Sequence, residues 1–497
     1  MEAKWWTLIA VCVATFMLLL DVTIVNVALP YIERSLDASF ADLQWVVDAY
    51  ALTLAALLLT GGSLADLFGR RLVFIVGLGI FTVASLFCGF AGTALMLNLA
   101  RGLQGVGGAL MFATALALLA GAFQGADRGT AFGLWGATTG AAVAVGPLVG
   151  GALTEWLGWE AIFFVNVPIG LGAIALTLAK VQEVRGGGEG QVDWAGLVTF
   201  SAGLFALVFA LIRGNPEGWG SPLIVGLLVV AVVALVAFVL VERSGAHPML
   251  DLTLFRNPTF GGASIAAFVL SATIFSMFLY LTLYVQNILG YSALEAGLRF
   301  LPATLMSFAV APLSGKLAER HGTRWFMAGG LLLVAAGLWL MSGLEAGDDW
   351  TALLAGFLVA GGGIGLVNPA LATTAVGVVD ARRAGMASGI NSTFRQVGIA
   401  TGIAGLGALF QHFVASAFVA PAGSAGRAPA GGEIADFISF GGAARSGNEA
   451  LARAGEQAFV IGLNDLLHYA AVVALLGAIA VAALVRQRDF VARAVPA

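Results

Sequence analysis

Apolar runs of about 20 residues recur along almost the whole chain, and this recurrence restricts the fold more than any other feature. A helix needs roughly 20 apolar residues to cross the ~30 Å hydrocarbon core of a bilayer. Fourteen such runs fall at 6–29, 43–65, 72–91, 95–123, 131–154, 160–180, 194–213, 222–241, 260–285, 296–314, 325–343, 351–376, 386–413 and 464–485. Only 10% of the 497 residues are charged, against about 25% in a typical soluble domain. The sequence therefore predicts an all-α integral membrane protein with fourteen spans and excludes a soluble enzyme.

The distribution of lysine and arginine predicts the orientation of the spans. When the N-terminus is placed in the cytoplasm, sixteen of these residues fall on the cytoplasmic side and five on the external side. The other three, Arg101, Arg299 and Arg395, lie inside spans. Because cytoplasmic loops carry the excess of positive charge, we expect both termini in the cytoplasm. The first run is longer than a signal-peptide core and is expected to remain as a span.

Composition and missing motifs exclude several other classes of partner and cofactor. A net charge of −4 offers no basic surface for nucleic acid. Cys12 and Cys88 both fall inside apolar runs, and no spacing of histidine, cysteine and carboxylate predicts a metal site. The chain lacks a phosphate-binding Gly-Lys-Ser/Thr loop, so we expect no ATP and no cofactor. Without a nucleophile–base constellation either, the chain is not expected to be an enzyme.

An internal repeat divides the spans into blocks of six, two and six. The segment GSLADLFGRR at 62–71 recurs as GKLAERHGTR at 315–324, an offset of 253 residues, and each copy joins the second and third spans of a six-span block. Two parallel six-helix halves with a substrate site between them are typical of the major facilitator superfamily. We therefore predict a six-helix bundle at 1–182, an inserted helix pair at 183–256, and a second bundle at 257–497 with an external loop at 415–458.

Three charged residues of the first bundle lie at similar depth. Asp21 precedes Pro30 by nine residues, which places it about 13 Å from the outer end of its span, and Arg101 and Asp48 lie at about 10 Å and 8 Å. Charges at such depth are costly and indicate function. Protonation of an acid beside Arg101 would release that arginine, so the three residues are candidates for proton coupling. Alternatively, Asp21 only hydrogen-bonds a neighbouring helix, and Asp48 lies in the external mouth.

The loop at 62–71 is a candidate gate on the cytoplasmic side. Its candidate residues are Gly62, Asp66, Gly69, Arg70 and Arg71. Asp66 is expected to accept hydrogen bonds from a nearby helix N-terminus and to pair with an arginine across the interface, which would latch one conformation. The alternative is a charge cluster that only sets topology.

Small residues crowd the fifth span. Its glycines include Gly136, Gly140, Gly146, Gly150 and Gly151. Pairs spaced by four residues let another helix approach closely, and Pro147 removes one backbone donor and bends the helix. General helix packing would explain the same pattern.

Five further polar residues inside spans are candidates to line the central cavity. They are Asn26, Gln104, Asn391, Arg395 and Gln396. For Arg395 and its neighbours, burial against a backbone carbonyl is an equal alternative.

Four segments together carry a resemblance to a known family. They lie at 20–30, 62–71, 97–109 and 146–151. These segments resemble the signature motifs of the fourteen-span drug:proton antiporters of the major facilitator superfamily, and the resemblance covers essentially the whole chain. Two positions depart from the family pattern: Leu67 stands where a basic residue is usual, and Glu160 where arginine is common.

The resemblance implies an exporter in the bacterial inner membrane that exchanges a lipophilic or cationic small molecule for protons, with membrane lipid around it. It assigns proton coupling to Asp21 and Arg101, the antiporter helix to Gly146 and Pro147, and the gate to Asp66 with Arg71. Two other readings remain open. One is a symporter or facilitator for a nutrient or metabolite on the same fold, and the other is a membrane sensor that transports nothing.

Overall fold

The computed structural model describes residues 2–38, 40–123, 126–183, 193–244, 250, 252–380, 383–419, 433–439, 443 and 446–490. Every regular element in these ranges is helical. The α-helices are α1 (Ala3–Leu36), α2 (Phe40–Phe68), α3 (Arg70–Gly89), α4 (Ala94–Ala122), α5 (Ala126–Leu157), α6 (Ala161–Phe164), α7 (Asn166–Lys180), α8 (Trp194–Glu217), α9 (Pro222–Ser244), α10 (Pro258–Leu283), α11 (Ala293–His321), α12 (Thr323–Met341), α13 (Leu354–Gly377), α14 (Ala384–Ala417), α15 (Glu433–Ser439) and α17 (Glu449–Leu484).

The predicted all-α membrane fold is confirmed. Each of the fourteen apolar runs falls on helical residues except for one or two residues at some ends, and the sixth run is divided between α6 and α7. Among the described residues, thirteen segments are long and apolar enough to cross a membrane. Helix α5, with 32 residues, has the length to make the fourteenth span.

The segment predicted as an external loop at 415–458 is partly helical. Helix α15 lies within it, and α17 begins at Glu449 rather than near 464. The Asn448 side chain accepts hydrogen bonds from the backbone N–H groups of Ala450 and Leu451 and so caps this early start. The first turns of α17 are polar, so an apolar run does not reveal them. The part of the loop at 420–432 lies outside the described residues.

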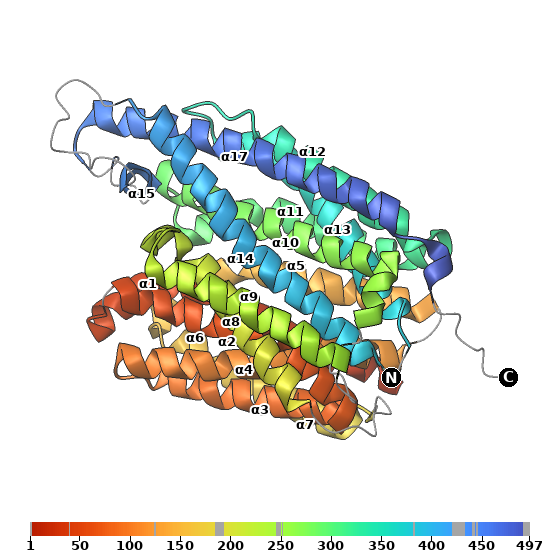
Figure 1. Cartoon of the computed structure of the whole chain (residues 1–497). Helices are drawn as coiled ribbons and strands as arrows, with labels where there is room; N and C mark the ends of the chain where they lie inside the picture. The colour runs from red at the N-terminus through yellow and green to blue at the C-terminus, as the bar shows by residue number, and fades with distance from the viewer. Residues whose placement is uncertain are drawn as a thin grey trace.

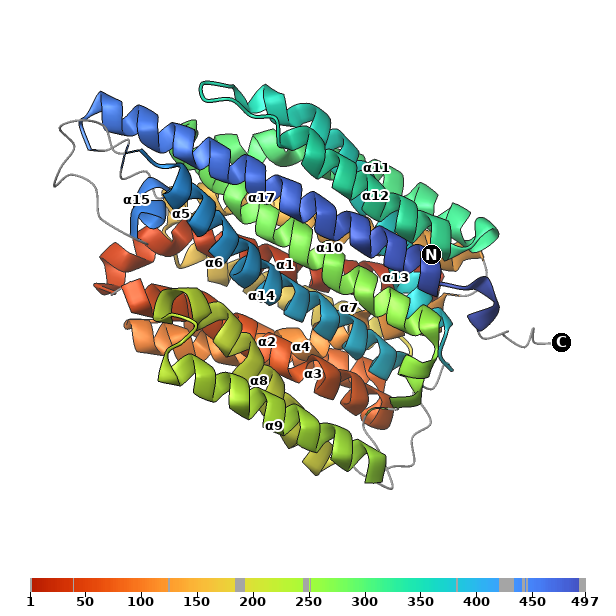
Figure 2. The ribbon, with the colours of Figure 1, turned by 45° about the horizontal axis from the view of Figure 1, so that its top comes forward.

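The helices form two bundles that lie side by side (Figure 1). Helices α1 to α7 pack on one another as the amino-terminal half, and α10 to α17 form the carboxyl-terminal half. The halves meet along α5 against α11 and α13, and along α2 and α4 against α14. Helix α1 begins and α17 ends at the same end of the molecule, opposite α15 (Figures 1 and 2). The predicted domain boundaries near 183 and 257 adjoin segments outside the described residues and stay predictions.

The inserted pair, α8 and α9, packs across the two halves. Helix α8 contacts α2 of one half and α14 of the other, and α9 packs on α8. Figure 2 shows α9 at the edge of the bundle with α8 on its inner side. The Thr60 and Ser201 hydroxyls join α2 to α8 at 3.3 Å. The pair therefore covers one seam between the halves.

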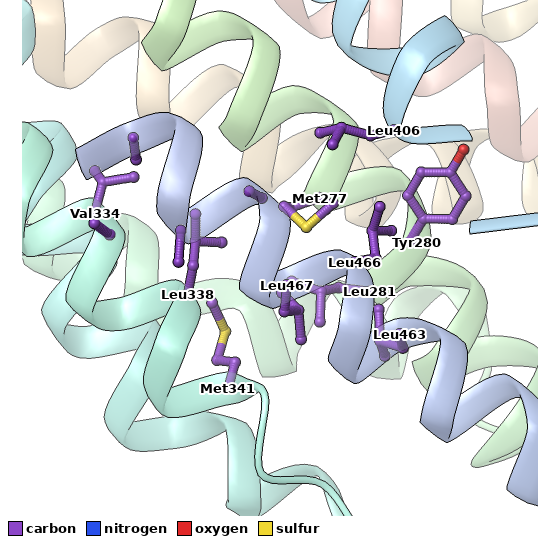
Figure 3. Close-up of a cluster of buried hydrophobic side chains, with 14 of the residues drawn as sticks. Met277, Tyr280, Leu281, Val334, Leu338, Met341, Leu406, Leu463, Leu466 and Leu467 are labelled. Atoms are coloured by element: carbon purple, nitrogen blue, oxygen red, sulfur yellow. The ribbon is translucent and has the colours of Figure 1, made fainter. Parts of the chain in front are cut away.

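Close apolar packing holds the carboxyl-terminal half together (Figure 3). The residues that meet there from α10, α12, α14 and α17 include Met277, Leu281, Leu338, Met341, Leu406, Leu463 and Leu467. Lipid tails are as apolar as these side chains, so packing and small residues, rather than exclusion of water, stabilise such helix contacts.

Candidate functional site

An ion pair at the centre of the amino-terminal half joins α1 to α4. The Nη1 atom of Arg101 lies 2.5 Å from Oδ2 of Asp21. The Asp21 side chain is fully buried and that of Arg101 is 1% exposed. Two of the three charges that the sequence places at similar depth therefore meet. A buried pair of this kind is tolerated only where further hydrogen bonds satisfy its remaining donors and acceptors.

Neutral side chains from α4 and α7 supply hydrogen bonds to the pair, and one from α3 supports them. The second carboxylate oxygen of Asp21, Oδ1, accepts from Nε2 of Gln104 at 2.9 Å and from Nδ2 of Asn166 at 2.9 Å. Both amides also donate to the Ser85 hydroxyl, at 3.3 Å and 3.0 Å. We call these five residues (Asp21, Ser85, Arg101, Gln104 and Asn166) the buried polar network.

Arg101 is fixed by more than its charge. Its Nη1 also donates to Oε1 of Gln104 at 2.7 Å, and its Nε donates to the carbonyl oxygen of Val46 on α2 at 2.9 Å. The guanidinium lies over the Tyr50 ring, 4.3 Å from its centroid. Helix α4 comes this close to α2 because position 105 is a glycine: a Cβ there would lie 2.4 Å from the Tyr50 carbonyl oxygen.

Asn166 and Ser85 were not among the residues predicted for this site. Asn166 is an amide inside the apolar run at 160–180, which is a usable signal, and its side chain is 1% exposed. Ser85 lies in α3 with no exposed surface and donates to the Phe163 carbonyl at 2.9 Å. Nothing in the sequence around Ser85 distinguishes it from an ordinary packing residue. Gln104, predicted to line the cavity, belongs to the network instead.

Asp48 lies outside the buried polar network. It is half-buried on α2, and the opposite charge that acts on it is Arg213 of α8. Arg213 also forms an ion pair with Glu217 at 2.6 Å. The structure therefore brings Asp48 to the inserted pair and not to Asp21 and Arg101.

The loop at 62–71 joins the two halves through Asp66. Its Oδ1 accepts from the backbone N–H of Gly385 at 3.1 Å, and its Oδ2 accepts from that of Met386 at 2.9 Å. Both N–H groups belong to the first turn of α14, where the helix has free donors and a positive end. We call this contact of Asp66 with Gly385 and Met386 the inter-half latch. It lies at the end of the bundle where α1 begins.

The arginine that pairs with Asp66 comes from the same half. Nε and Nη2 of Arg70 lie 3.2 Å and 3.0 Å from Oδ1 of Asp66, so the expected pair across the interface is instead a pair four residues apart. Arg71 donates from Nη2 to the Leu178 carbonyl at 2.6 Å. Its backbone N–H donates to Glu183, whose carboxylate caps the start of α3.

Two glycines let the loop approach its neighbours. A Cβ on Gly62 would lie 2.4 Å from the carbonyl oxygen of Gly385, so any side chain there would push α2 away from α14. Gly69 has a φ of +112°, a conformation that side chains strongly disfavour, and it separates α2 from α3. The tight turn keeps Asp66 at the start of α14.

Glycines of α5 face helices of both halves. A Cβ on Gly146 would lie 1.8 Å from Oγ1 of Thr23, and one on Gly150 would lie 2.7 Å from Cγ1 of Ile24, so α1 packs directly on this face. A Cβ on Gly140 would lie 3.6 Å from Oγ of Ser307 on α11, in the other half. A Cβ on Gly151 would meet no atom within 4 Å. Pro147 lies in α5, and its side chain is outside the described part of the chain.

The remaining candidate residues lie in the carboxyl-terminal half, apart from Asn26. Arg395 and Asn391 are buried on α14, and Nε of Arg395 lies 3.4 Å from Oδ1 of Asn391. Gln396, beside them, is half-buried. Asn26 lies in α1, but its side chain is outside the described residues.

The chemistry available at the centre of the first half is the gain and loss of a proton on Asp21. In the described ranges no three His, Cys, Asp or Glu side chains gather as metal ligands would. The carboxylate instead has one cationic and two amide donors around it. A proton on either oxygen would displace one of these donors, and the displaced donor would have to find a new partner.

Many membrane-crossing helices in two bundles, with a buried ion pair in one and a latch between them, define a polytopic membrane transporter. The chain matches the family model of the Major Facilitator Superfamily over residues 11–403 and belongs to that family. It is a transporter rather than an enzyme.

Curated relatives agree with the resemblance inferred from the four motifs, which is confirmed. The chain is 37% identical over 415 residues to the tetracenomycin C resistance and export protein of Streptomyces glaucescens, covering 83% of this chain and 77% of that protein. It is 39% identical over 406 residues to the puromycin resistance protein pur8 of Streptomyces alboniger, covering 81% and 80%. It is 37% identical over 411 residues to the multidrug resistance protein Stp of Mycobacterium tuberculosis, covering 82% and 76%.

A solved structure supports the fold. The human organic anion transporter MFSD10 superposes with a TM-score of 0.61, covering 95% of this chain and 99% of that one. Sequence identity is 13%, so this likeness concerns architecture alone.

Proposed function

We propose that the protein exports drug-like small molecules across the bacterial cytoplasmic membrane in exchange for protons, by alternating access, with both termini in the cytoplasm. Relatives named for resistance to antibiotics and for their export support the substrate class. The observation that supports coupling of export to protons is the fully buried Asp21 carboxylate, which is bonded by Arg101 and two amides. An ionisable group enclosed at that depth is expensive to keep and is expected to have a function.

Proton binding at Asp21 would change the contacts between α1 and α4. A neutral carboxyl group attracts the Arg101 guanidinium far less than a carboxylate does, since the ion pair is lost. The freed guanidinium would turn toward its other acceptors, the Val46 carbonyl and Gln104. Proton release would restore the pair. The two protonation states therefore favour two arrangements of the amino-terminal half.

Helix α5 offers a path from this event to the boundary between the halves. Thr23, two residues beyond Asp21, packs against Gly146 of α5. Helix α5 in turn packs along α11 and α13 of the other half. A shift of α1 would displace α5 as well, because helices in close-packed contact cannot move independently at that contact. The inter-half latch would then break on one side of the cycle and form again on the other.

Two measurements test this proposal. The protein is first expressed in a bacterial host without its own exporters and screened against antibiotics and dyes, puromycin among them. The compound to which it gives the greatest resistance becomes the reporter compound. Everted membrane vesicles are then energised, and a pH-sensitive acridine dye reports protons that leave when the reporter compound enters.

The wild type should show proton release that depends on the reporter compound, and Asp21→Asn should abolish it. Asp37→Asn is the matched control, because Asp37 is an exposed acid at the end of the same helix. Its φ of 48° suits asparagine equally well. An unchanged proton signal in Asp21→Asn would refute coupling through Asp21, and a wild type that protects against no compound would refute drug export.

A further inference from the structure

One buried cation of the carboxyl-terminal half has no acidic partner in the part of the chain that the structure describes. Arg395 on α14 is 9% exposed, and among the described residues no carboxylate forms an ion pair with it. Its Nη2 donates to Oδ1 of Asn368 on α13 at 3.0 Å, and its Nε lies 3.4 Å from Oδ1 of Asn391. Both acceptors are neutral amide oxygens. The other two deeply buried arginines that carry described ion pairs, Arg101 and Arg70, are matched by Asp21 and Asp66.

A guanidinium without an acidic partner is costly inside a membrane bundle unless a group of opposite charge binds it during the transport cycle. Arginine has five N–H donors in a planar fork, and the described hydrogen bonds of Arg395 occupy two of them. The remaining donors suit a group with two oxygen acceptors, because a guanidinium binds such groups through parallel hydrogen bonds. The site is therefore complementary in charge and geometry to an anion that is not part of the chain.

The position of Arg395 suits a ligand that binds between the halves. A Cβ on Gly136 of α5 would lie 3.3 Å from Cβ of Asn368, so Asn368 lies on the face that α13 presents to the amino-terminal half. Along α14, Gly389 packs against Leu58 and Leu59 of α2, next to the inter-half latch. Arg395 follows six residues later, or about 9 Å further along the helix axis. It therefore lies further into the bundle than the inter-half latch, on the same helix.

A further polar group accompanies Arg395 on the same face of α14. Ser388, Asn391 and Arg395 follow the spacing of residues that share one side of a helix. The Ser388 hydroxyl is buried and has no hydrogen-bond partner among the described residues. A buried polar atom without a partner calls for an explanation, and a bound ligand is one.

We propose that Arg395, with Asn368 and Asn391 beside it, binds the carboxylate group of an exported organic acid. The inference rests on the proposed export function and specifies its substrate class. It replaces the lipophilic or cationic substrates that the family resemblance implies, because a cation would meet the Arg395 charge with no acid beside it. Asp21 and Arg101 keep the proton, and Arg395 selects the cargo.

The experiment uses matched probes that differ only in charge. Purified full-length protein is reconstituted in liposomes and supplied with naphthoate, naphthamide and naphthylmethylammonium, and with the same three derivatives of anthracene. Fluorescence of the rings reports transport under an imposed pH gradient. The wild type should move each acid at least about tenfold faster than its amide, the difference expected for a hydrogen-bonded charge. Arg395→Gln should lower the transport rate of each acid to that of its amide. Arg395→Lys should retain part of the preference for acids, since lysine keeps the positive charge but lacks the planar set of donors.

Arg299→Gln is the control, because Arg299 stacks on Tyr291 at the far end of α11 and should leave the preference unchanged. Melting temperatures of all variants show that the protein is folded. The inference is overturned if the wild type prefers the cation or the amide, or if Arg395→Gln leaves the ratio of acid to amide unchanged. It is also overturned if sodium chloride raises the wild-type melting temperature as much as sodium naphthoate at equal ionic strength, since Arg395 would then hold only an inorganic ion.

Asp21→Asn separates this inference from the proposed function. Loss of pH-driven transport in that variant, with the preference for acids still visible in exchange without a gradient, would support both. Retained pH-driven transport would refute coupling through Asp21 and leave the assignment of Arg395 standing. A wild type that transports no member of the panel would overturn the assignment of substrate class.

Discussion

Asp66 of α2 and Gly385 of α14 are 319 positions apart in the chain and are joined by a hydrogen bond of 3.1 Å from the Gly385 backbone N–H to the Asp66 carboxylate. The residue before α14, Arg383, provides no side-chain cap for its own helix. Asp66 therefore takes the role of an N-cap residue from the other half of the molecule. Two backbone N–H groups at the start of α14 have this acceptor only while the two halves meet at this end, which couples helix capping to the conformation of the transporter.

Asp66→Asn is expected to weaken the inter-half latch. Asparagine has one acceptor oxygen in place of two and carries no charge, and hydrogen bonds to a charged group are worth about 1.5–3 kcal/mol. The closed population at this end should fall about tenfold or more relative to the open one. Double electron–electron resonance between spin labels at Phe68 and His321, both exposed at the latch end of opposite halves, should show longer distances. Cys12 and Cys88 are replaced by alanine beforehand.

Glu183→Gln is the matched control for that measurement. Glu183 also caps a helix start, through the backbone N–H groups of Arg71 and Leu72, but both partners belong to the amino-terminal half. Its replacement should leave the distance between the two labels unchanged. Equal distances in wild type and Asp66→Asn would show that the latch does not hold the halves together.

Arg101→Lys should abolish export although it keeps the positive charge. Lysine cannot bond at once to Asp21, Gln104 and the Val46 carbonyl, and it lacks the planar group that lies over Tyr50. We expect resistance to the reporter compound to fall at least about tenfold at equal expression in the membrane. Arg299→Lys, outside the network, should stay within about twofold of the wild type. Full resistance in Arg101→Lys would mean that only the charge matters at this position.

The sequence allowed most of the fold to be predicted because the bilayer imposes a length on every span. Apolar runs therefore located the long helices, and the repeat at 62–71 and 315–324 indicated two halves. The extension of α17 escaped, since its first turns are polar and are held by a cap at Asn448 rather than by lipid.

The site was harder to predict because its residues come from helices far apart in the chain. Depth alone suggested that Asp21 and Arg101 meet, and it also suggested Asp48, which the rotation of α2 turns toward α8. The partner of Asp66 within its own half was readable, since Arg70 follows it by four positions. Its acceptance of hydrogen bonds from a helix start was expected, but which helix depends on the packing of the two halves.

Asp48→Asn should leave proton coupling intact, because Asp48 lies outside the buried polar network and interacts with Arg213 of α8. We expect reporter-dependent proton release within about twofold of the wild type in everted vesicles, under conditions where Asp21→Asn gives none. The variant should also leave the melting temperature within about two degrees of the wild type, because a partly exposed charge interaction contributes little to stability. Complete loss of proton release would place Asp48 on the proton path.

Gly146→Ala should impair the contact between α1 and α5, and the same change at Gly151 should not. A Cβ at position 146 would lie 1.8 Å from Oγ1 of Thr23 and force the two helices apart, whereas one at position 151 would meet no atom within 4 Å. Overpacking of this kind costs about 1–3 kcal/mol, so Gly146→Ala should lower the melting temperature and at least halve the export of the reporter compound. Addition of Thr23→Ala, which removes the closest atom, should restore part of the melting temperature and part of the export. Equal effects of the two alanine substitutions, measured at matched expression, would show that the close approach of α1 at Gly146 has no special part in transport.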